Sequence, residues 1–242
     1  MNTKRNSFGF TLIELIVVIS IIVLMMAIAL PTIVTLFTSG ADSQARNIVG
    51  TTLKAAQQIA ITSRLDTGVH FQWDATNETV MIAIVQKKYT DTTVNPNVVK
   101  YDKYDLAEGC VPMRLPGGMA AGEVSNAWGN NYGTLTQANL PSFSTFTVVF
   151  DRDGRLADRP AVVFNPAAEI LDVNNPSAKA KDCWESSTEL TTGEPSVRAL
   201  CIYNGKVAGT LSNATLPGWM DTNVQFLAVN PYTGGLIRSP AE

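Results

Sequence analysis

A single carboxylate stands near the start of a long apolar run in this sequence. Residues 4 to 31 read KRNSFGFTLIELIVVISIIVLMMAIALP, and Glu14 is the only acidic residue among them. No later residue in this stretch is charged, and Ser20 is the only plain polar one. An acidic side chain at the centre of a membrane helix costs about 2.5 to 3.5 kcal/mol on insertion scales, and less near an end. The position of Glu14 therefore calls for a chemical reason.

Two explanations of Glu14 remain open. In the first, the carboxylate lies at a membrane interface near a helix start, where a negative charge suits the helix dipole. In the second, it pairs with a cation inside an assembly. The simplest such cation is a freed α-amino group, which requires a cleavage just upstream. A carboxylate and an ammonium in low dielectric each relieve the cost of burying the other. The second explanation makes Glu14 a register device that is satisfied only on assembly.

The apolar run itself approaches the ~20 residues that a helix needs to span a bilayer. Lys4 and Arg5 precede it and predict that this end faces the cytoplasm, with residues 40 to 242 on the other side. A secretory signal peptide would end in a cleavage site of small residues. Here Pro31 and more helix-compatible sequence come next, so we expect the run to stay in the working protein. Pro31 is expected to bend the helix.

After this proline the helical pattern resumes. Apolar residues recur at three- and four-residue steps between residues 33 and 60, which predicts an amphipathic helix. Residues 41 to 63 are expected to pack on the protein's own core, whereas residues 10 to 38 would face lipid or other subunits. The expected polar face carries Asp42, Gln44, Arg46, Lys54, Gln57 and Arg64.

The rest of the chain reads as β structure. Alternating or apolar runs bounded by turn residues predict strands in residues 69–74, 79–87, 146–150, 155–164, 196–207 and 224–239. We expect the first two to form one hairpin, residues 146–164 a second, and the last two segments further strand and turn pairs. Residues 88–144 and 165–195 lack clear periodicity and are interpreted as two long insertions or loop regions, with short strands as an alternative in the first. The predicted class is α+β, with a long N-terminal helix packed on an antiparallel sheet.

Composition limits the partners and the compartment. The chain has 242 residues, 45% hydrophobic and 16% charged, so it can bury a core. Its formal net charge of −3 makes it a poor partner for nucleic acid, whose binding depends on Lys and Arg neutralising phosphates. If the body is exported, its three cysteines allow one disulfide. Cys183 and Cys201 are the favoured pair because they would close a short loop, and that pairing leaves Cys110 over. Unpaired cysteines remain the alternative.

Other candidate sites carry less chemistry. Asp151, Asp153 and Gly154 in DRDG resemble half of a calcium loop, but the later bidentate Glu is missing, so we favour a hairpin turn. His70 is the only histidine and is expected to be a structural or a surface residue, not a catalytic one. The sequence contains no nucleophile-elbow, Walker or zinc-protease motif, and no Cys/His spacing typical of a metal site. We therefore expect no enzymatic activity, no metal and no cofactor.

The stretch GFTLIEL after a short basic leader resembles the class III signal of type IV pilins and type II secretion pseudopilins. The resemblance implies that a prepilin peptidase cuts after Gly9 and methylates the new N-terminus, Phe10. Glu14 is then the fifth mature residue and would neutralise the amine of a neighbouring subunit as the filament grows. Pro31 would be the twenty-second mature residue, at the family's helix kink.

This resemblance also implies an organisation and a set of partners. Residues 1–9 would be the leader, 10–38 a transmembrane and assembly helix, and 39–242 a periplasmic or extracellular pilin-like domain. The partners implied are other pilin or pseudopilin subunits, the prepilin peptidase, the inner-membrane assembly platform and the lipid bilayer. No nucleic-acid partner is expected. The protein would lie in the bacterial inner membrane with its N-terminus cytoplasmic and then enter a filament.

Within that family, the body resembles the H-type minor pseudopilins and FimT-like minor pilins in two turn motifs, TVVFDRDGRL and AVNPYTGGLI. The expected function is that of a minor pseudopilin in a type II secretion pseudopilus. One alternative is a minor pilin that captures DNA, which would need more basic residues near the C-terminus than the sequence has. Another is a major pilin of a surface fibre.

Overall fold

The computed structural model describes residues 12–74, 77–91, 101–124, 134–157, 163–164, 184–187 and 197–238. Within these stretches, side chains are described except at 28–39, 89–91, 101–103, 163–164, 184–187 and 238. The chain divides into two compact units, residues 1–41 and 42–242, and each is described by itself below.

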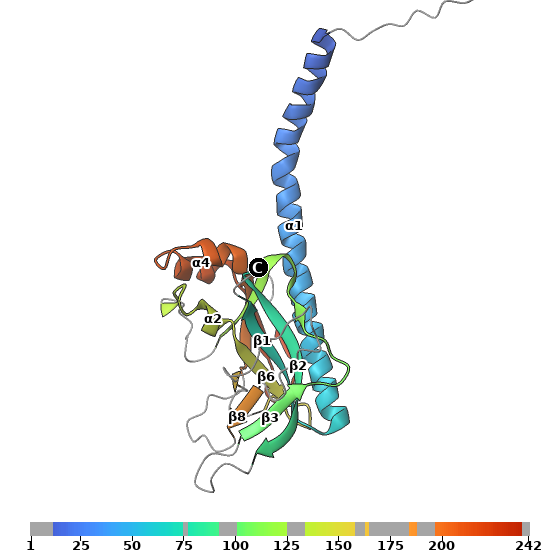
Figure 1. The fold of residues 1–242 in the computed structure, drawn as a ribbon, viewed down its shortest axis with the longest axis vertical. Helices are drawn as coiled ribbons and strands as arrows, with labels where there is room; N and C mark the ends of the chain where they lie inside the picture. Colours follow the sequence, from blue (N-terminus) through green and yellow to red (C-terminus); the bar gives the residue numbers. More distant parts are fainter. Residues whose placement is uncertain are drawn as a thin grey trace, which may run out of the picture. The chain divides into compact units, whose positions relative to one another are not determined.

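Helix α1 (Leu12–Ser63) has 52 residues and contributes to both units (Figure 1). The helix assignment continues through position 31, and the bend expected at Pro31 stays a prediction. Across the part of the chain that the structure describes, no helix is both long and apolar enough to cross a membrane.

The C-terminal half of α1 carries the predicted apolar stripe. Five side chains at steps of three or four residues are almost completely buried: Ala45, Val49, Leu53, Ala56 and Ala60. The expectation that residues 41 to 63 pack on the protein's own core is therefore confirmed.

Seven strands form the first sheet, and every pairing in it is antiparallel. Their order is β6-β1-β2-β3-β8-β7, with β4 paired to β2. The strands are β1 (Thr67–Asp74), β2 (Thr79–Asp91), β3 (Tyr101–Leu106), β4 (Met113–Arg114), β6 (Phe146–Phe150), β7 (Val163–Phe164) and β8 (Trp184–Ser187). The predicted β1–β2 hairpin is confirmed, with His70 opposite Ala83.

Four strands form a second antiparallel sheet in the order β11-β10-β9-β5. They are β5 (Met119–Glu123), β9 (Ala199–Asn204), β10 (Gln225–Val229) and β11 (Leu236–Arg238). The β10–β11 hairpin predicted in residues 224–239 is confirmed. The region expected to be a loop insertion, residues 88–144, contributes the end of β2 and strands β3, β4 and β5. Both sheets therefore include strands from that region. The resulting α+β class, with helix packed on antiparallel sheets, agrees with the predicted pilin-like fold.

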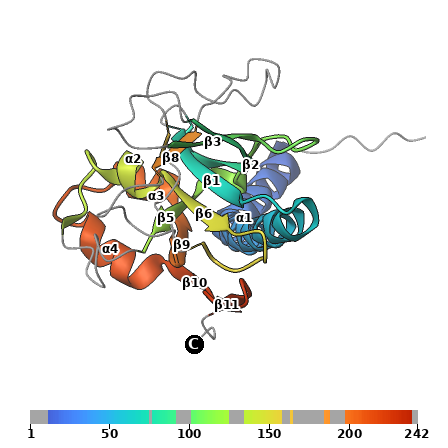
Figure 2. The same ribbon diagram turned by 90° about the horizontal axis from the view of Figure 1, so that it is seen from below.

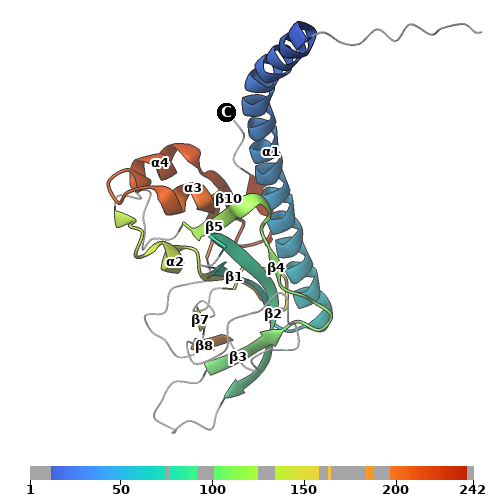
Figure 3. The same cartoon turned by 45° about the horizontal axis from the view of Figure 1, so that its top comes forward.

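Short helices accompany the sheets: η1 (Pro116–Gly118), α2 (Leu140–Phe143), α3 (Gly205–Thr210) and α4 (Leu216–Asn223). Figures 2 and 3 show α2, α3 and α4 on the side of the strands away from the C-terminal half of α1. The strands of the body thus have helical cover on two sides.

One predicted turn is wrong. Residues 196–207 were expected to form a strand and a turn, but β9 runs directly into α3 at Asn204 and Gly205. Asn204 has φ −82°, and its side-chain oxygen accepts a hydrogen bond from the Val207 amide over 3.1 Å. Asparagine is favoured at this capping position because its side chain satisfies an amide that the first helical turn leaves without a partner. Asn204 therefore caps the start of α3 and does not form a turn between two strands.

The predicted hairpin of residues 146–164 forms only in part. β6 takes β1 as its strand partner, while the segment after the turn adds an isolated bridge between Phe150 and Leu156. The Ala157 amide also donates to the Val149 carbonyl over 2.8 Å. Residues 158–162 lie outside the described residues.

His70 lies in the body's core, where β1 pairs with β6. Its Nδ1 shares a hydrogen bond with the Thr147 hydroxyl over 2.8 Å, and the residue is 1% exposed. Burial disfavours the imidazolium and lowers the pKa of His70 to about 3. His70 is therefore neutral at physiological pH, as a structural histidine should be.

Tyr203 of β9 fills the space beside α2. Its hydroxyl and that of Ser144 are hydrogen-bonded, and its ring packs against Phe143 with centroids 6.0 Å apart. Burial raises the pKa of the Tyr203 phenol well above its usual range. A side chain at Gly122 would overlap the Phe143 ring, with only 1.9 Å between them. Glycine in β5 therefore makes room for the aromatic pair.

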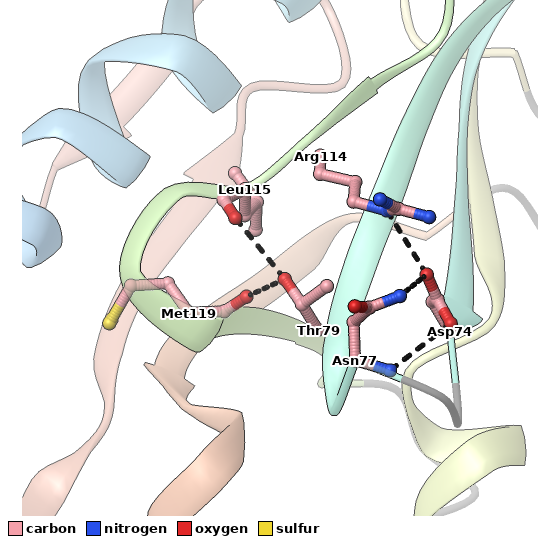
Figure 4. A network of polar contacts seen from close by, with 6 residues as sticks. All are labelled: Asp74, Asn77, Thr79, Arg114, Leu115 and Met119. Atoms are coloured by element: carbon pink, nitrogen blue, oxygen red, sulfur yellow. Dashed lines mark hydrogen bonds and ion pairs between the residues drawn. The ribbon is translucent and has the colours of Figure 1, made fainter. Parts of the chain in front are cut away.

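A polar network attaches β4 to the β1–β2 hairpin (Figure 4). The Arg114 Nε donates to the Asp74 carboxylate over 3.1 Å, and the Asn77 side-chain amide donates to the same oxygen over 2.8 Å. The other Asp74 oxygen accepts the Asn77 backbone amide over 3.3 Å. One carboxylate thus shapes the hairpin turn and binds the next segment.

Thr79 adds a second attachment in the same place. Its hydroxyl lies 2.8 Å from the Met119 carbonyl and 3.2 Å from the Leu115 carbonyl (Figure 4). Thr79 is buried, so these carbonyls obtain a donor that water does not supply. The segment that leads from the first sheet into the second is therefore held at both of its ends.

Candidate functional site

The candidate site is the N-terminal part of α1, which belongs to the first unit. The described helix begins at Leu12, so Glu14 lies in its first turn and is exposed. A negative charge is stabilised there by the amide dipoles of the helix start. Gly9 and Phe10 lie outside the described residues, and their expected processing and methylation stay predictions.

Every side chain from position 12 to position 27 is exposed. The exposed fractions of the large apolar ones range from 46% at Ile22 to 76% at Leu12. A helix that is apolar on all sides is stable only when lipid or other protein covers it. The apolar surface of this segment therefore indicates that lipid or another protein chain covers it.

Ser20 is the one polar interruption after Glu14, and its hydroxyl is satisfied within the helix. Its Oγ donates to the Ile16 carbonyl over 2.8 Å. Serine and threonine in apolar surroundings use this bond to the preceding turn because no water is available there. Ser20 therefore needs no outside partner.

A second notable place lies in the body, where Gln57 holds two turns. The Gln57 side-chain amide donates to the Gly154 carbonyl over 2.7 Å and to the Thr233 carbonyl over 2.8 Å. The first turn comes after β6 and the second joins β10 to β11. The sequence pattern put Gln57 on a solvated polar face, so this role was missed. The only signal for this role was the position of Gln57, which is four residues after Leu53 and three before Ala60 of the buried stripe.

Two glycines allow this close approach. Gly154 has φ +78° and Gly234 has φ +63°, a region that side chains strain. A Cβ at Gly154 would lie 2.6 Å from Ile61, and one at Gly234 would lie 2.3 Å from both the Gln57 amide nitrogen and the Gly154 carbonyl. Both turns thus need glycine for conformation and for space.

The DRDG segment forms the hairpin turn that its sequence favoured over a calcium loop. One Asp151 oxygen accepts the amides of Asp153 and Arg155, each over 2.9 Å. The carboxylate is therefore committed to its own turn. Among the described residues, no group of three or more histidine, cysteine, aspartate or glutamate side chains is arranged to hold a metal ion.

Asp42, another residue of the expected polar face, links α1 to β10. Its carboxylate lies 3.5 Å from the Arg46 guanidinium and accepts a hydrogen bond from the Gln225 amide. All three side chains are partly buried. Half of the expected polar face thus serves to attach the helix within the body.

The predicted disulfide is untested. Cys201 is buried in β9, whereas Cys183 lies outside the described residues. Cys110 is half-buried, and burial raises the pKa of its thiol. The pairing of Cys183 with Cys201 stays a prediction.

Comparison with known proteins bears on the N-terminal segment. Residues 4–30 match the family described as the prokaryotic N-terminal methylation motif. The match spans the basic leader, the glycine of the expected junction, Glu14 and nearly all of the apolar run. No curated protein and no solved structure matches the chain.

Proposed function

We propose that this chain is a minor pseudopilin of a type II secretion system, on the premise that its N-terminal methylation motif, residues 4–30, is the motif of type IV pilins and pseudopilins. The family assignment makes it a prepilin-like structural protein that is processed by a prepilin peptidase, and not an enzyme. The motif also implies anchoring in the inner membrane and later incorporation into a filament with other pilin-type subunits.

One observation carries the proposal furthest. The helix from Leu12 to Met26 exposes apolar side chains on every face, while its first turn carries the carboxylate of Glu14. Lipid can cover such a surface before assembly, and the equivalent helices of other subunits can cover it afterwards. Only the helices of other subunits offer the Glu14 carboxylate an ammonium group in a fixed position.

The assembly chemistry derives from these residues. Cleavage after Gly9 would free the amino group of Phe10, which the peptidase then methylates without removing its positive charge. Glu14 of an incoming subunit would pair with that ammonium on its neighbour. In low dielectric, a subunit without the carboxylate leaves one buried ammonium uncompensated, which costs several kcal/mol. Incorporation would therefore depend on Glu14.

The body supports the choice of a minor pseudopilin within the family. It builds two sheets and several short helices between α1 and residue 238, including the turn segments that resemble those of H-type pseudopilins. A bulky body is inconvenient for a tightly repeating fibre and suits a subunit used in few copies. A minor or major pilin of a type IV pilus is the second candidate, because the same N-terminal motif serves those proteins.

A deletion strain distinguishes the two candidates. The pseudopilin proposal expects exported enzymes to accumulate in the periplasm while surface fibres remain, with secretion restored by the wild-type chain. Loss of fibres with normal secretion would support the pilus alternative and overturn the pseudopilin assignment. Complementation with a Ser20→Ala chain serves as a matched control, because that side chain is satisfied within its own helix.

A further inference from the structure

Two turns of the body lie side by side and present one surface. These are residues 151–155, after β6, and residues 230–235, between β10 and β11. The Leu156 amide donates to the Pro231 carbonyl over 3.2 Å, and Gln57 binds a carbonyl in each turn. The exposed side chains that the turns and the nearby end of α1 display are here called the turn patch: Arg64, Arg152, Asp153, Arg155 and Tyr232.

The turn patch holds side chains that the fold does not use. Tyr232 is 81% exposed. Arg152 and Arg155 are exposed, and neither forms an ion pair with any other described residue. Arg64 pairs only loosely with Asp153, over 3.4 Å and with both side chains largely solvated. An aromatic ring and two guanidinium groups without an ion pair are therefore exposed on two turns that contact each other.

Local charge contrasts with the charge of the whole chain. The turn patch has three arginines against the Asp153 carboxylate, and the neighbouring Asp151, which accepts two backbone amides of its own turn, adds a second negative charge, so the local formal net charge is +1. The complete chain has a formal net charge of −3. A basic surface on an acidic protein is complementary to other acidic protein surfaces. It is too small, and too close to carboxylates, for the multiple phosphate contacts that nucleic-acid binding needs.

We propose that the turn patch is a docking surface for a carboxylate-bearing face of a neighbouring protein subunit. Arginine binds carboxylates through two parallel N–H donors, and tyrosine and arginine together dominate the energetics of protein interfaces. Tyr232 supplies apolar area beside the charges. The identity of the neighbour as a filament subunit rests on the proposed function, whereas the chemistry of the surface does not.

Gln57 is the positioning residue of this surface. Its two hydrogen bonds fix both turns to one helix, so the arginines and the tyrosine are held in register before any partner arrives. Preorganisation lowers the entropic cost of binding. Gly154 and Gly234 have no side chains where the turns and Gln57 meet, which keeps this arrangement tight.

Site-specific photocrosslinking in cells that express the full chain tests the proposal. A benzoylphenylalanine at position 232 should give an adduct whose partner peptide comes from a protein subunit and contains Asp or Glu. The same probe at Val207, an exposed apolar residue of α3, is the positional control and should not give this adduct.

Charge variants sharpen the test. We expect Arg152→Glu to reduce the adduct about tenfold, as loss of one close interfacial charge pair would. Lys206→Glu, a single charge reversal in α3, should leave it unchanged. Arg152→Gln and Arg155→Gln remove the charge and keep a polar side chain, so each should reduce the adduct in part. They take the place of Arg152→Glu in the test if that variant does not fold. Equal yields at positions 232 and 207, insensitivity to these arginine changes, or an adduct with nucleic acid or lipid would each overturn the proposal.

The same samples separate this proposal from the proposed function. Processing after Gly9 is read from the mass of the chain. A processed chain without the adduct defeats the docking surface alone. An unprocessed chain that still forms the adduct defeats the proposed function alone.

Discussion

The side-chain amide of Gln57 donates a hydrogen bond to the backbone carbonyl of Gly154, 97 residues further along the chain, over 2.7 Å. The same nitrogen donates to the Thr233 carbonyl over 2.8 Å. Three distant segments, one from α1 and one from the end of each hairpin, thus meet at one atom. This contact decides how the turns of the body are presented.

Replacement of Gln57 by alanine should destabilise the body. The carbonyl of buried Gly154 would lose its donor, and an unsatisfied buried polar group costs about 1 to 3 kcal/mol, whereas water can replace the donor to the exposed Thr233 carbonyl. Gln58→Ala is the matched control, since Gln58 is exposed and such surface changes usually stay within about 0.5 kcal/mol. Urea unfolding of the full chain in detergent measures both. Equal losses for the two variants would contradict the role given to Gln57.

Alanine substitutions at two glycines separate backbone strain from crowding. Gly154 and Gly109 have φ of +78° and +76°, so both variants carry the strain of a left-handed residue, about 1 to 2 kcal/mol. Only at Gly154 would the new Cβ also meet a neighbour, Ile61 at 2.6 Å, whereas Gly109 has open space. Gly154→Ala should therefore lower the thermal midpoint clearly more than Gly109→Ala. Similar shifts for both variants would show that the turn at Gly154 moves away from Ile61 without a loss of stability.

Local patterns in the sequence predicted those helices and strands in which the pattern itself shows the buried face. The stripe from Ala45 to Ala60 depends on which face of the helix is buried, and periodicity records that directly. Asn204 shows the limit: asparagine before glycine serves a turn or a helix cap equally well, and the choice depends on the tertiary contacts of the next segment. α3 itself has small residues and no apolar period that would have announced it.

Strand β5 of the second sheet and the Gln57 contact escaped prediction for a related reason. β5 reads MAAGE, whose small residues make room for Phe143 and Tyr203 from distant segments. Gln57 differs from Gln58 only in which turns happen to lie beside it. In the N-terminal segment the opposite holds, because Glu14 stands out against an apolar run without any knowledge of the fold.

Acid should destabilise the body through His70. Its pKa is about 3 in the folded state against 6.5 in the unfolded chain, so the unfolded state binds the extra proton between these values. The free energy of unfolding should be constant above pH 6.5 and fall by about 1.4 kcal/mol per pH unit below it. The chain has no other histidine, so the range from about pH 6 to pH 5, just below the ordinary pKa of an imidazole, reports on this ring.

The check is urea unfolding at half-unit steps from about pH 7 to pH 5, which brackets the unfolded-state titration of the imidazole. A His70→Asn chain, which keeps a polar group toward Thr147, should show a nearly flat profile over that range. A flat profile for the wild-type chain would mean that the folded state accommodates the imidazolium.

Glu14→Ala should separate processing from assembly. Under the proposed function the peptidase cuts after Gly9, so the variant should be cut normally, but it should enter filaments at a small fraction of the wild-type level because a neighbour's ammonium is left unpaired. Immunoblots of membrane and filament fractions measure both steps, with Ser20→Ala as the control that should assemble normally. Normal incorporation of the Glu14 variant would remove the neutralisation argument.

Peptide mass spectrometry of the N-terminus, in the membrane fraction and in sheared fibres from the same cells, is the decisive measurement for processing and for the minor role. We predict a mature chain that begins at Phe10 with a methylated amino group, concentrated with the membrane and scarce in the fibres. Gly9→Ala should leave the uncut form in the membrane. A chain that keeps residues 1–9 in wild-type cells would contradict processing, and abundant mature chain in the fibres would contradict a minor pseudopilin.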